Sequence, residues 1–417
     1  MFGKGSLLAV FGFITAFSIY QLKLNNAITA VSDNFNEYYV QTVVHQEVIN
    51  AMNFGVNKVW ATETNSDSFQ IVANSCTTNV SIYPGGLDTV IVKARSWDYY
   101  FDQEYYAQYN KSAKYADSAF AYFSFTMPIS KYFMFTNTGG NIFWITGDTV
   151  WGPIHSNHTI KTSGSPVFYG KVTAYKGISP DPTKKTSQAY YYGGWEIGNK
   201  VDMPKDMSLI KNTATASNAG APMNTKCLYD QETTFDFQAN GDVIRTVGAN
   251  PPDTVAITSI APAGVVYCTK DIRVKGVFNG RVTFYSDDDI WIDDNITYAN
   301  DPETDPYSDD IIGLVANDDV IITDNVANNV DINIQACIMA VNGSFTADNY
   351  SGRPPAGVLK MTGSVVQDTR GAVGTFNWVG LQSGFRKSYR FDDRLERIGP
   401  PCYPLVRTLT LLHWWET

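Results

Sequence analysis

The chain has 417 residues, a length that predicts two or three folding units rather than one. Lysine and arginine total 31 against 41 aspartate and glutamate, and the resulting net charge of −10 argues against a nucleic-acid partner, which would need a basic surface. Only 17% of residues are charged while 14% are aromatic, and strand and turn formers are abundant, so most of the chain is expected to be β-structure.

The first element is an uncharged apolar stretch, Gly5–Leu22, whose length of roughly 27 Å as a helix nearly matches a bilayer core. It continues without a break into apolar residues at helical spacing, and no proline occurs before Pro84. These residues are Leu24, Ile28, Val31, Phe35, Tyr39, Val43 or Val44, Val48, Met52, Val56 and Val59. We expect one continuous helix over Ser6–Trp60, roughly 80 Å long, that packs against lipid, a head domain or copies of itself.

The start of the chain, Met1-Phe2-Gly3-Lys4-Gly5 followed by Ser6-Leu7-Leu8-Ala9-Val10, resembles the class III signal of type IV pilins and PilX-type minor pilins. In that family a peptidase cuts after the glycine, and the helices later bundle into a filament core. The resemblance implies cleavage between Gly5 and Ser6. It also implies a filament-core surface made of Leu7, Leu8, Val10, Phe11, Phe13, Ile14, Phe17, Leu24, Ile28, Val31 and Phe35.

One position departs from the family, because most pilins have glutamate at the fifth mature position and this chain has Val10 there. That departure argues against the standard assembly of a major pilin. The alternative is a signal anchor that is never cut and only tethers a surface domain. The helical stripe beyond Leu22 favours the pilin-like interpretation, since an anchor needs no pattern outside the bilayer.

Residues 61–150 are expected to form a separate β module that is rich in tyrosine. Its aromatic residues, which are candidates for a glycan- or protein-binding face or for simple packing, are Tyr99, Tyr100, Phe101, Tyr105, Tyr106, Tyr109, Tyr115, Phe120, Tyr122 and Phe123.

An internal repeat dominates the remainder of the chain. Val167–Thr173 (VFYGKVT) recurs as Val277–Thr283 (VFNGRVT), and the eleven residues that begin at Ile154 align with those that begin at Val266. Downstream, Phe284–Ile292 parallels Leu314–Ile322, and Met339–Ala347 follows the same outline. Equivalent positions Ile272, Ile290, Val320 and Phe345 are separated by 18, 30 and 25 residues.

Short strands joined by polar corners at such steps predict a parallel β-solenoid over residues 151–400, with an insertion at 174–262. A two-sheet sandwich is the competing fold. We expect the apolar residues of 401–417 to cap the last coil. The body also resembles a largely uncharacterised bacterial family that combines a pilin-like start with such a repeat. The resemblance rests on Gly152–His155, Asn342–Thr346, Arg370–Phe376 and Gly384–Leu395.

The acidic tract Asp287–Asp324 holds 13 carboxylates and no lysine or arginine. Stacked corners would bring Asp287, Asp289, Asp318 and Asp319 together, where oxygen ligands could hold Ca²⁺, although no EF-hand or nonapeptide calcium motif is present. A solvated acidic face is the simpler interpretation. Likewise, His155 and His158 could offer two imidazoles to a metal, but both align with ordinary positions of the repeat.

The sequence therefore predicts a mainly β protein with one long N-terminal helix, acting as a non-enzymatic subunit of an extracellular pilus-like filament. Its expected partners are copies of itself and, before assembly, the inner membrane. The alternative is a membrane-anchored surface β-helix that acts as an adhesin or binds surface glycans.

Overall fold

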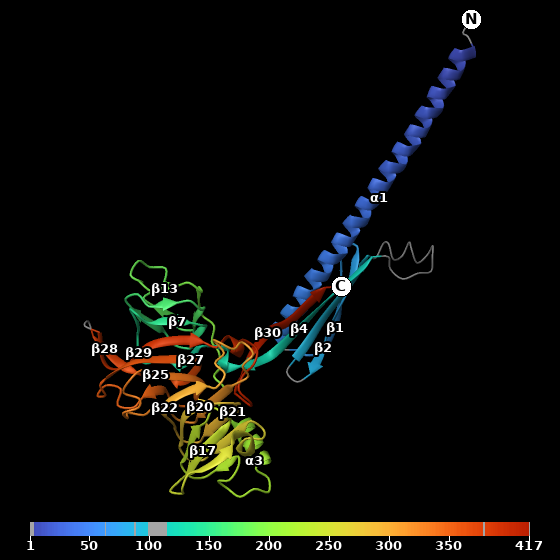
Figure 1. The fold of residues 1–417 in the computed structure, drawn as a ribbon. Helices are drawn as coiled ribbons and strands as arrows, with labels where there is room; N and C mark the ends of the chain where they lie inside the picture. Colours follow the sequence, from blue (N-terminus) through green and yellow to red (C-terminus); the bar gives the residue numbers. More distant parts are fainter. Residues whose placement is uncertain (1–3, 63, 87–88, 99–114, 378–379, 417) are drawn as a thin grey trace. The chain divides into compact units, whose positions relative to one another are not determined.

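The computed structural model describes residues 4–62, 64–86, 89–98, 115–377 and 380–416 (Figure 1). The side chains of residues 4–9, 36 and 408–409 are not described. The chain divides into two compact units, Met1–Thr126 with Thr408–Thr417, and Met127–Arg407. The predicted class, mainly β with one long N-terminal helix, is confirmed.

The first unit contains the helix α1 (Lys4–Thr62), which extends the predicted Ser6–Trp60 by two residues at each end. The absence of proline and the continuous apolar stripe explain why it runs unbroken over 59 residues. A five-stranded sheet completes the unit, with the order β1-β2-β3-β4-β30. Its strands are β1 (Asp67–Ala73), β2 (Cys76–Gly86), β3 (Thr89–Asp98), β4 (Ala116–Pro128) and β30 (Leu405–Glu416).

The carboxyl-terminal half of α1 packs on this sheet through the predicted stripe. Val44, Val48, Met52 and Val59 are each at most 1% exposed, and the last three pack on valine, isoleucine and alanine side chains of β2, β3 and β4. Gly55 lies between them, and a Cβ there would lie 2.7 Å from Cγ1 of Val92. The helix therefore approaches the sheet more closely than a larger residue would allow.

Strand β30 corrects the prediction that residues 401–417 cap the last coil of the repeat. Leu405–Glu416 instead forms an edge strand of the first unit's sheet beside β4. Trp415 stacks on Phe120 and Tyr122 with ring centroids 5.7 Å apart in both cases. The apolar pattern of residues 405–416 fits any exposed strand edge, so it does not specify which edge the strand joins. The aromatic partners that place it beside β4 lie nearly 300 residues earlier in the chain.

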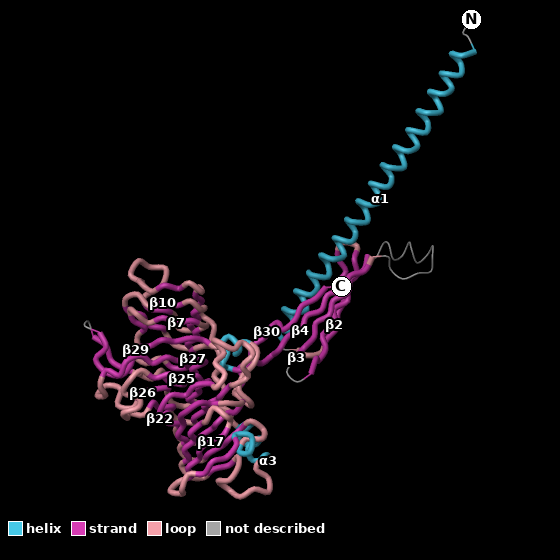
Figure 2. Tube along the Cα trace, viewed as in Figure 1, coloured by secondary structure: helices cyan, strands magenta, loops and turns pink. Residues whose placement is uncertain are grey.

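The second unit is a stack of coils whose strands pair mostly in parallel from one coil to the next (Figure 2). The chain forms the first run of coils with β5 (Met134–Thr138), β6 (Trp144–Ile145), β7 (Thr149–Trp151), β8 (Ile154–Ser156), β9 (Ile160–Ser163), β10 (Val167–Phe168), β11 (Val172–Ala174), β12 (Ile178–Ser179), β13 (Tyr190–Tyr191) and β14 (Trp195–Ile197). A crossover that contains α3 (Ser208–Ser217) follows.

The second run starts at the opposite end of the stack. It comprises β15 (Leu228–Tyr229), β16 (Thr233–Phe237), β17 (Asp242–Val247), β18 (Asp253–Ala256), α4 (Ile257–Ile260), β19 (Val265–Cys268), β20 (Ile272–Phe278), β21 (Arg281–Ser286), β22 (Ile290–Tyr298), β23 (Ile311–Ala316), β24 (Val320–Ile322), β25 (Ile332–Ala340), β26 (Phe345–Ala347), β27 (Pro355–Thr369), β28 (Gly374–Asn377) and β29 (Gly380–Phe391).

Parallel pairing orders the coils. One ladder runs β15-β19-β21-β23-β25-β27-β5-β8-β11-β14, so β27, near the end of the second run, pairs with the first strand of the first run, β5. A second ladder continues from β27 through β29, β7 and β10 to β13. The chain thus enters the stack in its middle, winds to one end, crosses to the other and winds back to where it began.

The register confirms the predicted equivalence of Ile272, Ile290, Val320 and Phe345. Ile272 pairs with Ile290, Ile290 with Val320, and Val320 with Phe345. Their side chains form a column in the core that is at most 2% exposed. One alignment is wrong by a residue, because Leu314 pairs with Ile338 rather than with Met339. The corner before Phe345 holds one residue more than the corner before Val320, and the shift is absorbed there.

Two predicted boundaries are wrong. Residues 174–262 are not a simple insertion, since β13 and β14 form the coil at one end of the stack while β15 and β16 form a coil at the other. The β module also does not extend to residue 150, because β5, β6 and β7 belong to the coils. The sequence repeat is weaker in these coils than in the central ones. A coil at an end of the stack has a neighbouring coil on one side only, so its residues are in a different environment from those of a central coil.

A hydrogen bond and two ion pairs hold the crossover segment against the coils. Val201 donates its backbone N–H to Asn157 in the first run, at 3.0 Å. Lys205 then forms an ion pair with Asp368 at 2.9 Å, and Lys211 of α3 forms one with Asp287 at 2.7 Å. The segment therefore contacts coils of both runs as it passes from one end to the other.

Candidate functional site

The amino-terminal half of α1 is an exposed apolar surface. The described members of the predicted filament-core set are between 47% and 81% exposed, and they are Val10, Phe11, Phe13, Ile14, Phe17, Leu24, Ile28, Val31 and Phe35. Tyr38 and Tyr39 extend the same surface, which we call the apolar arm and define as residues 10–39. Figure 1 shows this half of α1 projecting beyond the sheet of its own unit. Apolar surface of this extent marks an interaction site in folded proteins.

The first residues of the predicted apolar stretch lie among those whose side chains the structure does not describe. The side chains of Leu7 and Leu8, and those of Gly5 and Ser6 at the predicted cleavage point, are among the residues that are not described. Within the described part of the chain, no helix carries an apolar stretch long enough to span a membrane.

The predicted aromatic face of residues 99–123 is also only partly described. Tyr99, Tyr100, Phe101, Tyr105, Tyr106 and Tyr109 lie outside the described residues. Tyr115 and Phe123 are buried, while Phe120 and Tyr122 support Trp415. The described members therefore act in packing.

The acidic corners form a ladder of hydrogen bonds along the stack. The Asp271 carboxylate accepts from the backbone N–H of Asp289 at 3.2 Å, and the Asp289 carboxylate accepts from that of Asp319 at 2.8 Å. The Asp319 carboxylate accepts in turn from the backbone N–H of Ser344 at 2.6 Å. Each carboxylate thus satisfies a backbone donor of the next coil, which explains why aspartate recurs at this position of the repeat.

The four carboxylates suggested as calcium ligands have different surroundings. Asp287 is held by Lys211 and accepts a hydrogen bond from the Tyr267 hydroxyl. Burial acts to raise the pKa of Asp287, but these hydrogen bonds and the Lys211 charge lower it overall. The pKa of Asp289 is raised, first by burial and then by neighbouring carboxylates. Asp318 accepts from the side-chain amide of Asn317 at 2.9 Å. Among described residues, no group of three or more histidine, cysteine, aspartate or glutamate side chains is placed to hold a metal ion.

His155 is used inside the stack. It is 1% exposed, and its ring nitrogens contact the Thr173 hydroxyl at 2.8 Å and the Asn157 amide oxygen at 3.0 Å. Its ring stacks on Phe135 at a centroid distance of 5.3 Å. Burial lowers the pKa of His155, with a further contribution from Lys131. Both ring nitrogens are therefore occupied by side-chain partners, as expected of a structural histidine.

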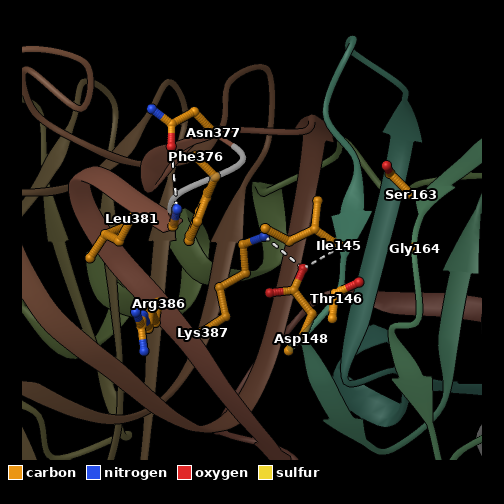
Figure 3. Close-up of a pocket in the computed structure, with 12 residues that line it drawn as sticks. Ile145, Thr146, Asp148, Ser163, Gly164, Phe376, Asn377, Leu381, Arg386 and Lys387 are labelled. Carbon is orange, nitrogen blue, oxygen red and sulfur yellow. Dashed lines mark hydrogen bonds and ion pairs between the residues drawn. The ribbon is translucent and has the colours of Figure 1, made fainter.

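A cavity of about 740 Å³ opens where the first coil meets the last (Figure 3). On one side it is lined by the corners at Thr146–Asp148 and Ser163–Gly164, and on the other by Phe376, Leu381 and Lys387 of β28 and β29. At its floor, Lys387 and Asp148 form an ion pair at 3.1 Å, and the same carboxylate accepts the backbone N–H of Ile145 at 3.0 Å.

Trp144 and Arg370 surround this ion pair. The Lys387 ammonium lies 5.4 Å from the Trp144 ring centroid, and the Arg370 guanidinium lies 4.2 Å from it. Burial lowers the pKa of Lys387 and lowers that of Arg370 to about 10. The ion pair joins the two runs of coils, because Asp148 belongs to the first run and Lys387 to the second.

Comparisons with known proteins add little to this geometry. No protein-family model matches the chain, and a search of curated proteins found no match. Among solved structures, the competence-associated pilin ComZ from Thermus thermophilus aligns over 91% of this chain and 96% of its own, with 10% sequence identity and a TM-score of 0.36. A likeness at that level carries no argument about either fold or function.

Two features were missed at the sequence level. The Asp148–Lys387 ion pair joins residues 239 positions apart, and no sequence pattern near either residue predicts it. An aromatic residue followed by glycine, in contrast, recurs as Trp151-Gly152, Tyr169-Gly170 and Tyr192-Gly193 at steps of 18 and 23 residues. That pattern could have been read as a column on three successive coils.

Proposed function

We propose that the chain is a structural, non-enzymatic subunit of an extracellular pilus-like filament of the type IV kind. The apolar arms of many copies bundle in the filament core, and the β heads, each a sheet module and a β-solenoid, lie outside. The observation that carries the proposal is the contrast within α1, where one face of residues 44–59 is packed on the sheet and residues 10–39 are exposed.

The energetics favour a partner along the whole apolar arm. Fully burying one large apolar side chain contributes roughly 1.5–3 kcal/mol, so the nine described residues of the predicted surface could contribute on the order of 10 kcal/mol before the costs of association. Between Val10 and Leu22 the arm has no charged side chain, and between Lys23 and Tyr39 it has only three. Copies of the same helix offer a matching apolar surface over the full length, whereas a bilayer core matches only about 20 residues.

The proposal includes the steps before assembly. The apolar arm first lies in the inner membrane, and a prepilin peptidase removes Met1–Gly5 so that Ser6 becomes the first residue. Amino-terminal sequencing of the protein from cells tests this step. A mature chain that still begins at Met1 would refute cleavage after Gly5.

The filament itself is tested on surface material sheared from the cells that produce the protein. Negative-stain microscopy with an antibody against the second unit should label filaments along their length. If the protein is absent from filaments and stays with the membranes, the alternative of an anchored surface protein that acts as an adhesin or glycan binder replaces the proposal.

A matched pair of variants assigns the assembly to the apolar arm. Phe13 is 81% exposed within the arm, and Phe54 is 66% exposed on the packed half of α1. Phe13→Asp should abolish labelled filaments while the cellular amount of protein stays the same, because a charge cannot be buried between apolar helices. Phe54→Asp should leave filaments intact. Equal effects of the two variants would show that the arm has no special role.

A further inference from the structure

An exposed column of aromatic rings runs along the first run of coils. Trp151 ends β7, Tyr169 follows β10, and Tyr192 follows β13. The Trp151 and Tyr169 rings are stacked at a centroid distance of 3.7 Å and an angle of 10°, and the Tyr169 and Tyr192 rings at 5.3 Å and 22°. All three are between 41% and 67% exposed. Such rings are neither part of the core nor covered by another described element.

Each of the three rings is followed by a glycine, at Gly152, Gly170 and Gly193. A Cβ on Gly170 would lie within 2 Å of the Gly152 carbonyl oxygen, and one on Gly193 would lie 2.3 Å from the Gly170 carbonyl carbon. Neighbouring coils therefore pack backbone against backbone at these corners, which leaves no room for a side chain.

The column stops at Trp151, where the next coil changes its residue type. In the ladder, Trp151 pairs with Arg390 of β29, so Arg390 holds the position that another ring would occupy. Its guanidinium forms an ion pair with Glu303 at 3.0 Å. Tyr169 covers one face of the indole, which leaves the opposite face toward this end of the column.

A groove of about 640 Å³ lies at this end. It is lined by Trp151, Gly152, Tyr169 and Gly170 on the aromatic side and by Arg390 and Asp393 on the polar side. Asp393 is exposed and has no hydrogen-bond or ion-pair partner among the described residues. The groove therefore combines a flat ring, a free carboxylate acceptor and a guanidinium donor.

We propose that this groove binds one pyranose unit of a neutral or amino-sugar oligosaccharide. The apolar C–H face of the sugar lies against Trp151, and its hydroxyl groups, which both donate and accept, bond to Asp393 and Arg390. Since Arg390 is already neutralised by Glu303 and Asp393 is not compensated, the site repels acidic sugars. Added peptide strands are excluded, because β7 is paired on both edges, by β29 and β10.

The test uses the full chain in detergent and a printed array of neutral, amino and acidic oligosaccharides. The wild-type protein should retain at least one neutral or amino saccharide and bind the acidic ones less. Trp151→Ala should weaken the best interaction by about tenfold or more, as the loss of a stacked aromatic anchor does, and Asp393→Asn should weaken it several-fold. Trp151→Phe keeps a ring face and should bind within a factor of about three of the wild type.

Trp195→Ala is the matched control, because Trp195 is an exposed tryptophan of β14 that does not line the groove. It should bind like the wild type. Thermal melting of each variant separates lost binding from lost folding. The proposal is overturned if the wild type binds no neutral or amino saccharide better than a folded Trp151→Ala protein, or if Trp195→Ala weakens binding equally.

Discussion

Replacing Gly152 with alanine tests whether the first coil of the second unit packs against its last. Gly152 has φ +146°, and a Cβ there would lie 2.4 Å from Cβ of Phe391 on β29 and 2.8 Å from Cβ of Phe133 before β5. Those two neighbours belong to opposite ends of the second unit's sequence. They meet at Gly152 only if the chain closes on itself as the ladders indicate.

The expected magnitude follows from two terms. A side chain at such a φ costs about 1–3 kcal/mol, and forcing extra volume into a packed site costs about 1–3 kcal/mol more. Gly147 separates the terms, because it also has positive φ, at +95°, but no described atom would lie within 4 Å of its Cβ. Gly147→Ala should therefore cost only the first term, and Gly152→Ala should be the less stable variant by about 1–3 kcal/mol.

Urea unfolding of the full chain in detergent, followed by tryptophan fluorescence, measures the difference, since Trp144, Trp151, Trp195 and Trp291 all lie in the second unit. The two variants are compared at equal m-values so that the midpoints report stability alone. If Gly152→Ala is as stable as Gly147→Ala, the two runs of coils do not meet at this glycine and the closure is wrong.

Three further predictions concern single polar residues of the stack. Asp289→Ala should lower the free energy of unfolding by about 1–3 kcal/mol, because the Asp319 N–H loses its acceptor. Asp289→Asn keeps an acceptor and should be as stable as the wild type. Equal urea midpoints for the two variants would contradict the hydrogen-bond ladder. The Arg353 side chain is fully buried and donates a hydrogen bond to the Asn328 carbonyl at 2.9 Å. Arg353→Met should therefore lower the free energy of unfolding by about 2–5 kcal/mol. A melting temperature within 1 °C of the wild type would refute this prediction. Burial lowers the pKa of His155, so the unfolded chain binds a proton at this residue more readily than the folded chain, and the free energy of unfolding should fall as the pH falls below the ordinary pKa of 6.5. His155→Gln should reduce this loss of stability between about pH 7 and 5. An unchanged dependence of stability on pH would show that another group titrates.

Local periodicity explains which parts of the fold were predictable from sequence. The helix was placed within two residues at each end because its stripe continues for many turns without proline. The column Ile272, Ile290, Val320 and Phe345 was found because each coil there repeats the same strand and corner, so that equivalent residues share one environment.

The closure and the two terminal coils were not predictable because they depend on partners far away in the sequence. Met134 pairs with Val365, and nothing in the few residues of β5 specifies that strand. The acidic tract was correctly located, but its role depended on geometry, since the aspartates cap backbone donors of the next coil. The aromatic column was visible as a recurring dipeptide, yet only the register with Arg390 shows where it ends.

The central claim is that the apolar arm of α1 is buried by other copies of the same arm. Helical reconstruction of purified filaments by cryo-electron microscopy tests it most directly. The account predicts a core of parallel α1 helices in which residues 10–39 contact neighbouring copies, with the β heads outside. Filaments that lack this chain, or a core in which residues 10–39 face solvent, would contradict it.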